Sequence, residues 1–511
     1  MLPAARASCG KVGTGFPQKR CENKNLEQTV RFPIRAPCSR TLASLTALAI
    51  CAGGCTTLGP DFKPPAAANS PGYAMVGDPT PSGVQQADIA VGAAPWWRDY
   101  GSAELDQVIR LAFANNPTIA EVKATLERAQ AEAAATVGGR LPQLDLNGGA
   151  RRARINTRTL GFTGFPPRTL NLYSVGAQVS YDLDLFGGAR RSTERDQART
   201  EARAREADAA YLTLAANIVA QAMRIAALRA QITATEAVVA DDRRIYTMLR
   251  QADAVGGKPR TAGAGALAEL LQDQAALPPL RRELALARHQ LALLVGRSPA
   301  EWTAPDFDVA SLKPPQDIPI SLPSSLLRRR PDILAAEAQL HAATAAIGVA
   351  AANRYPDLRL TASLTQTATS PADLFGYSAS SWNLVSGLTA PVFNGGALKA
   401  RQVAAEAEAR AALARYQQTV LRAFVQVSDA LAALGADEQE MAVLRLAELA
   451  ATTSEHDTRS AYAMGGVAQI EVVENQRTVN RVRILIVEAE GRKLQNLVTL
   501  SAATAAEWRI P

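Results

Sequence analysis

Alternating apolar and polar positions mark extended segments in two parts of the chain. From Tyr173 to Leu185, apolar or aromatic side chains occupy every second position. The same period covers Leu358–Thr365, and Leu144–Arg151 and Trp382–Phe393 are compatible with it. A period of two predicts β-strands. A strand over 173–185 would be about 43 Å long at ~3.3 Å per residue, which spans a bilayer core of about 30 Å when it is tilted.

One side of the predicted strand 173–185 is expected to face lipid. Its members are Tyr173, Val175, Val179, Tyr181 and Leu183. A half-buried sheet of a soluble protein is the alternative. It is disfavoured because only about four such strands occur, and they are flanked by helical segments too long for a compact domain.

Apolar residues that step by three and four predict long helices beside these strands. One seam runs through Tyr416, Val420, Val427 and Leu431. Such seams are typical of coiled coils. We expect this helix to turn back at Leu434-Gly-Ala436, and the glycine-rich stretch 256–265 to break the other long helix.

The chain contains two copies of one unit. Residues 116–146 align without gaps on 330–360, and Pro142 and Leu144 match Pro356 and Leu358. We divide the chain into a leader (1–54), an extended N-terminal segment (55–110), a first repeat (111–304), a proline-rich linker (305–325) and a second repeat (326–508). The repeats carry predicted β-hairpins at 143–185 and 357–393.

The predicted fold class is mainly α with a membrane β-barrel. Four strands with one lipid-facing side would leave unsatisfied backbone groups at the sheet edges in a bilayer. Four strands are also too few to close around a lumen, since the smallest single-chain membrane barrels have about eight. Several protomers must therefore share one barrel, and two or three copies would give eight or twelve strands.

The first 54 residues predict a secretory leader, with a true start possible near residue 30. Arg31, Arg35 and Arg40 precede a short apolar run, and Ala52-Gly-Gly54 lies directly before Cys55. This order predicts a lipoprotein with diacylglycerol and an N-acyl (palmitoyl) group on Cys55; an ordinary signal peptide with an incidental cysteine is the alternative. The leader carries +6 of the net charge of +7, so the basic balance does not argue for a nucleic-acid partner.

The side chains that carry chemistry are sparse. All five cysteines fall within the first 55 residues, and His289, His341 and His456 are far apart in the sequence. The chain has neither the HExxH spacing of a zinc site nor a glycine-rich phosphate loop. We therefore expect no enzyme activity, no catalytic residues, no metal site and no cofactor other than the covalent lipid.

Several short motifs, in order, resemble one family. Cys55-Thr-Thr-Leu-Gly-Pro-Asp-Phe-Lys-Pro64, Tyr181-Asp-Leu-Asp-Leu-Phe-Gly-Gly188 and Leu421-Arg-Ala-Phe-Val-Gln-Val-Ser-Asp-Ala-Leu431 resemble the NodT-type lipoproteins of the TolC-like outer membrane factor family. The resemblance covers essentially all of 55–511. It implies a homotrimer with a twelve-stranded barrel in the outer membrane and a helical barrel through the periplasm. It also implies an equatorial region where the stretch 256–265 breaks the first long helix.

The same resemblance implies a passive channel for drugs, metals or other solutes. Its implied partners are a periplasmic adaptor, an inner-membrane pump of the RND type and outer-membrane lipid. A type I secretion outlet for proteins is the alternative within the family, and a coiled-coil lipoprotein without a pore is a more remote one.

Asp429 is the candidate gate residue. It falls between the seam residues Val427 and Leu431, so its side chain should point away from the seam, and the predicted turn at 434–436 would place it near the periplasmic tip. The family resemblance implies aspartates near this motif at the tip. A solvated carboxylate on the outer face is the alternative.

Overall fold

The computed structural model describes residues 57–66, 72–75, 77–78, 81, 84–86, 95–156, 166–313, 318–320 and 323–504. The chain divides into two units, 1–54 and 55–511. The predicted leader and the acylation site Cys55 lie outside the described residues, and the following description concerns the second unit.

Helices dominate the first copy. They are α2 (Ala103–Asn115), α3 (Pro117–Gly138), α4 (Gly188–Ala254) and α5 (Arg260–Val295). The Asn116 side chain accepts a hydrogen bond of 2.8 Å from the backbone N–H of Thr118, and proline follows at the first helical position. Asparagine caps and first-turn prolines both favour a helix start, which explains why α3 begins directly after Asn116.

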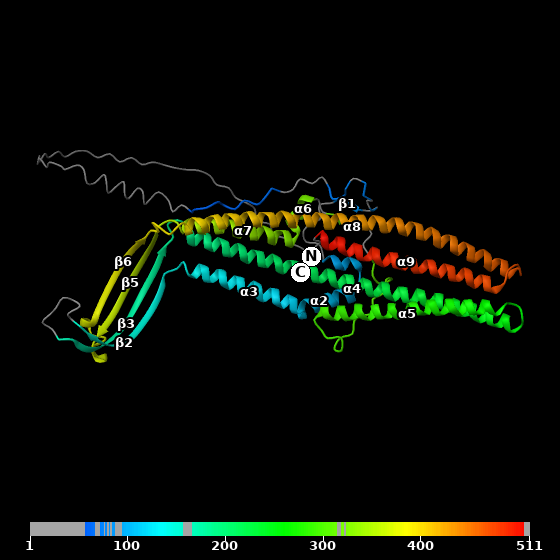
Figure 1. Cartoon of the computed structure of the whole chain (residues 1–511), viewed down its shortest axis with the longest axis horizontal. Coiled ribbons are helices and arrows are strands. Elements are labelled where there is room, and N and C mark those ends of the chain that lie inside the picture. Colours follow the sequence, from blue (N-terminus) through cyan, green and yellow to red (C-terminus); the bar gives the residue numbers. More distant parts are fainter. Residues whose placement is uncertain are drawn as a thin grey trace, which may run out of the picture. The chain divides into compact units, whose positions relative to one another are not determined.

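The second copy repeats this series of helices. It contains α6 (Pro323–Arg329), α7 (Pro331–Ala352), α8 (Ala397–Ala463) and α9 (Gln469–Ala503). Helices α3 and α7 have 22 residues each, and α4 and α8 have 67 each, so the duplication extends to element lengths. In the helical layer, α4 contacts α3, α5, α7 and α9, whereas α8 contacts α7 and α9 (Figure 1).

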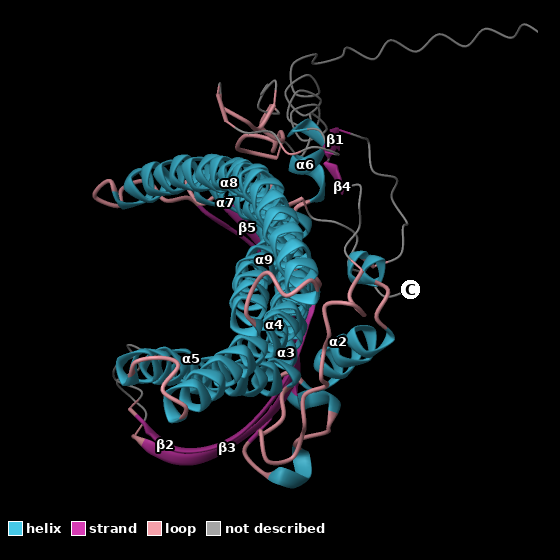
Figure 2. Ribbon diagram, turned by 90° about the vertical axis from the view of Figure 1, so that its right-hand side faces the viewer, coloured by secondary structure: helices cyan, strands magenta, loops and turns pink. Residues whose placement is uncertain are grey.

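Four antiparallel strands form one sheet in the order β2-β3-β5-β6. They are β2 (Gln143–Ile155), β3 (Arg168–Leu183), β5 (Asp357–Ala368) and β6 (Ser380–Thr389). Each copy contributes one hairpin, and β3 joins β5 across the two copies. The strands are long and curved, and they extend from the end of the layer where α4 and α8 begin (Figures 1 and 2). Two short strands, β1 (Val84–Gln86) and β4 (Ile318–Ile320), pair in parallel elsewhere.

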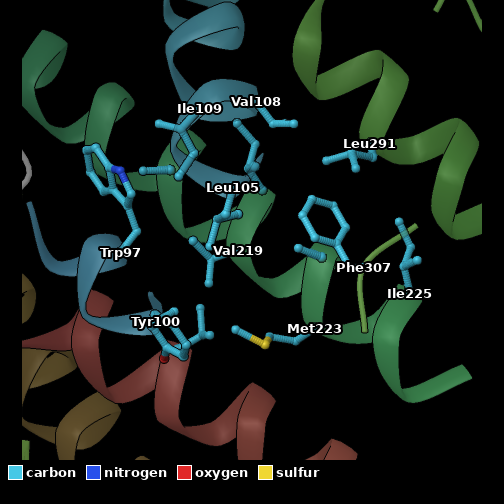
Figure 3. Packing of buried hydrophobic residues seen from close by; sticks show 14 of the residues in the cluster. Trp97, Tyr100, Leu105, Val108, Ile109, Val219, Met223, Ile225, Leu291 and Phe307 are labelled. Atoms are coloured by element: carbon cyan, nitrogen blue, oxygen red, sulfur yellow. The ribbon is translucent and has the colours of Figure 1, made fainter. Parts of the chain in front are cut away.

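The main core lies midway along the long helices. Trp97 and Tyr100, on the short 3-10 helix Trp96–Tyr100, are fully buried against α2, α4, α5 and the segment around Phe307 (Figure 3). The Trp97 indole N–H donates to Asp106 at 3.0 Å. A second cluster joins Tyr73 to α6, α7, α8 and α9. The main core joins the two copies, because it also contains Leu494 and Val498 of α9, whereas the second cluster lies within the second copy apart from Tyr73.

Three of the described helices, α4, α7 and α8, are long and apolar enough to cross a bilayer, by length and composition only. In α4, 61% of the apolar window is buried inside the protein, against 39% in α7 and in α8. Burial within the helical layer therefore accounts for much of this apolar surface in α4 and for less of it in α7 and α8.

The predicted turn at Leu434–Ala436 is wrong, because α8 continues to Ala463. A single glycine inside a helix costs only about 1 kcal/mol relative to alanine. The seam continues past it, since Leu434, Asp437 and Met441 are buried, and Asn496 of α9 donates to the Asp437 carboxylate at 2.7 Å. Packing against α9 therefore stabilises α8 as a continuous helix across Gly435.

Candidate functional site

The sheet has one continuous apolar face. Residues paired directly across antiparallel strands project to the same face. Val179 pairs with Leu144 on one side and Ala362 on the other, and Ala362 pairs with Leu384. The next level joins Leu146, Ala177, Leu364 and Trp382. One face therefore carries apolar side chains from both copies.

The five predicted lipid-facing residues all project to this face. Tyr173, Val175, Val179, Tyr181 and Leu183 alternate along β3, and Val175, Val179 and Tyr181 are 41%, 38% and 37% exposed. Other strands contribute members that the sequence prediction did not name. The most exposed of these are Leu144, Leu146, Trp382, Leu384 and Leu388. Their alternation was detectable, but Val385 interrupts it in β6.

The opposite face of the sheet is polar over its inner part. Gln178 and Ser180 of β3 pair with Ser363 and Thr361 of β5. Asp182 pairs with Arg359, and an Arg359 guanidinium nitrogen donates to the Asp182 carboxylate at 2.9 Å. Polar side chains on one face and apolar ones on the other fit a wall between water and lipid.

The segment after Cys55 is fastened where the strands meet the helices. The Leu58 N–H donates to the Phe186 carbonyl at 3.2 Å. The buried Arg191 side chain of α4 donates to the Leu58 carbonyl at 3.1 Å and to Asp61 at 2.7 Å. At Gly59, where φ is +90°, an added Cβ would lie 2.5 Å from the Gly348 Cα of α7. The described chain therefore starts at the base of the sheet.

Phe62 and His341 add a second contact between the segment after Cys55 and the helices. Phe62 stacks on His341 with ring centroids 4.4 Å apart, and His341 Nε2 lies 3.0 Å from a Glu194 carboxylate oxygen. Burial opposes ionisation of Glu194, but hydrogen bonds from Arg191 and His341 outweigh it and lower its pKa. The contacts of His341 with Phe62 and Glu194 are therefore structural.

Both long helices turn back at the end far from the sheet, through matching glycine turns. Gly256 (φ 73°) follows α4, and Gly465 (φ 78°) follows α8. The next glycine N–H donates to the carbonyl of Ala252 in the first turn and Ala461 in the second, at 2.8 Å in both. The glycine-rich stretch 256–265 is therefore the distal turn and the start of α5. Its predicted equatorial position is wrong, because the left-handed Gly256 ends α4 only at the end of the helical layer far from the sheet (Figure 1).

Asp429 lies far from these turns. It is thirty-five residues before Met464, which is about 50 Å along a helix. The side chain is exposed between buried Val427 and buried Ala430, so it does point away from the seam. Its neighbour Ser428 donates to the Tyr73 carbonyl at 2.6 Å, in the midway core region. The predicted tip position of Asp429 is thus wrong, because the helix continues past Gly435.

A charged cluster joins α4, α5 and α9 nearer the distal end. Asp241 and Asp242 of α4 are 3% and 2% exposed. Asn480 donates to Asp241 at 2.6 Å, and Arg477 donates to Asp242 at 3.2 Å. Burial, together with a hydrogen bond to Asp273, raises the pKa of Asp242 to about 6. Arg477 and Arg481 also pair with Glu269 of α5, so the cluster fastens three helices.

The three histidines lie on three different helices, α5, α7 and α8. Among the residues that the structure describes, no group of three or more His, Cys, Asp or Glu is placed to hold a metal ion. His341 contacts Phe62 and Glu194 as described above, and the backbone carbonyl of His456 accepts a hydrogen bond from Ser460 within α8.

A family model described as outer membrane efflux protein matches residues 108–297 and again 322–506. The chain belongs to this family. Its two matched segments correspond to the two copies of the unit. Mainly helical architecture with antiparallel strands confirms the predicted fold class, and the predicted outer-membrane efflux family is confirmed as well.

Members of the family resemble the chain over most of its length. The pyoverdine export outer membrane protein OpmQ of Pseudomonas aeruginosa is 30% identical over 424 residues, covering 81% of this chain and 87% of that protein. The probable outer membrane lipoprotein SilC of Salmonella typhimurium is 26% identical and covers 91% and 98%.

Solved structures of outer-membrane channels share the fold. The channel OprN superposes with a TM-score of 0.77 at 25% identity and covers 88% of this chain and 99% of its own. The open state of the Neisseria gonorrhoeae channel MtrE gives a TM-score of 0.76 at 24% identity and covers 88% and 98%.

Proposed function

We propose that this chain is one protomer of an outer-membrane efflux channel that conducts solutes passively from the periplasm to the exterior. The observation that carries the proposal is the four-stranded sheet, apolar on one face and polar over the inner part of the other, with β2 and β6 as its open edges. Open edges are not stable in hydrocarbon, so neighbouring protomers must pair with them.

The two edges of the helical layer continue into the two edges of the sheet. Helix α3 leads into β2, and β6 leads into α8. At one edge α5 exposes Leu271, Leu286 and Leu293, and at the other α8 exposes Val443, Leu446 and Leu449. Apolar side chains at both edges of the helical layer support a closed ring of protomers. We propose a homotrimer, which gives a twelve-stranded barrel.

The proposed partners rest on the names of the relatives. The relatives' names include a cation efflux system protein and an antibiotic efflux pump outer membrane protein. We propose that this chain likewise works with a periplasmic adaptor and an inner-membrane pump of the RND type. In this role the protein is a conduit and performs no catalysis.

Conductance with a matched pair of variants tests the channel. Purified protein in planar bilayers should give discrete single-channel currents. Val179→Arg places a charge on the lipid side of β3 and should cost about 2–4 kcal/mol near the midplane, so the yield of trimer should fall. Gln178→Arg, one residue away on the other face, should assemble normally. Absent currents would contradict the channel, and equal yields would contradict the assigned faces.

We also propose that Cys55 carries the lipid anchor. The contacts of Leu58 with Phe186 and Arg191 support this, because they hold the chain three residues after Cys55 at the base of the sheet. Radiolabelled palmitate should enter the wild type and not Cys55→Ser. Equal labelling of both proteins would exclude acylation there. The variant should retain partial transport, since the barrel itself inserts in the membrane.

A further inference from the structure

The loop end of the first β-hairpin is strongly basic. Between Asp145 and Asp182 the sequence contains five arginines and no Asp or Glu. Four of them, Arg151, Arg152, Arg154 and Arg168, are exposed on β2 and β3. Within the part of the chain that the structure describes, no ion pair joins them to a carboxylate. The second hairpin has no such cluster, since its outer loop contains Asp373 and no arginine.

The strand register separates these arginines by face. Ala150 pairs with Tyr173, the last aromatic residue of the apolar face. Arg152 and Arg154 follow on the same face, where they pair with Asn171 and Thr169. Arg151 and Arg168 project to the other face. The apolar face therefore stops beyond Tyr173 and is followed at once by two arginines.

The length of the apolar face places these two arginines at headgroup level. From Leu183 to Tyr173 the strand is about 33 Å long, which gives about 25 Å of height at a tilt of ~40°. This equals the apolar band of outer-membrane barrels, about 25 Å. Arg152 and Arg154 lie roughly 5 and 10 Å higher on the same basis. This end of the sheet points away from the helices, hence toward the outer leaflet (Figure 1).

The chemistry of the pair fits phosphate. Arginine forms bidentate, charge-assisted hydrogen bonds with phosphate groups, and here no described carboxylate competes. We propose that Arg152 and Arg154 bind the phosphate groups of the glycolipid in the outer leaflet, lipopolysaccharide. The site rests on the proposed function, because it requires the apolar face of β3 to contact lipid. Arg151 and Arg168, on the lumen side, do not take part.

Two double variants test the site in full-length trimer. Arg152→Gln/Arg154→Gln removes both charges from the lipid side, and Arg151→Gln/Arg168→Gln removes two from the lumen side. Lipopolysaccharide is titrated into detergent-solubilised trimer, and binding is measured by native mass spectrometry. The first variant should bind at least about tenfold more weakly, because it loses two charge-assisted contacts, and the second should bind as the wild type does. The single variant Arg154→Gln should be intermediate, and it replaces the double variant if that does not assemble.

Two further arms identify the ligand. Lipopolysaccharide with its phosphates removed should bind as weakly to the wild type as the intact glycolipid binds to Arg152→Gln/Arg154→Gln. Inorganic phosphate at 10 mM should not displace the glycolipid; displacement would show a site for free anions and overturn the proposal. Equal losses in the two double variants, or no binding to the wild type, would also overturn it. Single-channel currents from the same trimers separate this failure from a failure of the channel assignment.

Discussion

Helices α4 and α8 occupy the same place in the two copies and have the same length, 67 residues, but their surroundings differ. Helix α4 contacts five other helices, α2, α3, α5, α7 and α9, and its exposed side chains are polar or alanine. Helix α8 has two helical neighbours and exposes Leu421, Val425, Val443, Leu446 and Leu449. Duplication thus gave two equal helices, one interior to the protomer and one at its edge. The apolar surface of α8 is available for the next protomer.

A buried charge gives the largest expected difference between the helices. Ile218 of α4 is fully buried, so Ile218→Asp should destabilise the fold by at least about 4 kcal/mol. Leu446 and Leu449 of α8 are 68% and 64% exposed, so Leu446→Asp/Leu449→Asp should keep helix content and lose the trimer. Circular dichroism and light scattering measure the two effects. A folded Ile218→Asp protein, or an intact trimer of the α8 variant, would remove the contrast.

A close approach between α9 and α4 gives a smaller effect. A Cβ added at Gly491 would lie 2.8 Å from the Ala227 Cβ, which cannot rotate away. Overpacking should outweigh the better helix propensity, so Gly491→Ala should destabilise by about 1–2 kcal/mol. Gly265→Ala of α5 meets open space and should stabilise by about 0.5–1 kcal/mol. Melting temperatures in detergent check both signs, and a stabilising Gly491→Ala would show that α4 is packed less tightly.

The buried cluster on α4 gives the smallest effect, a pH dependence. The pKa of Asp242 is about 6 in the folded protein, above its ordinary value of 3.8. Between these pH values the folded state binds the proton more tightly than the unfolded state, so this group makes stability fall as the pH rises from about 4 to 6. Glu269 and Asp273 of α5 and Arg477 of α9 face the same cluster.

Asp242→Asn should therefore flatten the fall in melting temperature between pH 4 and 7. Asp429→Asn is the matched control, because it changes an exposed carboxylate on α8, and it should leave the melting temperature at pH 7 nearly unchanged. Thermal melts across this pH range provide the measurement. An unchanged slope in Asp242→Asn would show that other groups cause the pH dependence.

The candidate site was predicted only in part. The face of β3 was predictable, because Tyr173, Val179 and Tyr181 alternate regularly and alternation alone fixes which side chains share a face. The position of Asp429 was not predictable, because a lone glycine permits both a turn and a continuous helix. In the sequence, Asp241 and Asp242 resemble charges on an ordinary solvated helix face. Only their contacts with α9 in the folded protein distinguish them from such solvated charges.

The sequence by itself determined the elements, the duplication and the family, because periodicity, caps and repeated motifs are local properties. Tertiary structure decided where the helices end and which of two equivalent helices is interior. Contacts between α8 and α9 keep α8 helical beyond Gly435. The two long helices end at the left-handed glycines Gly256 and Gly465 and not at Gly435. Such outcomes depend on packing between segments far apart in the chain, and local sequence does not encode which neighbour a helix will meet.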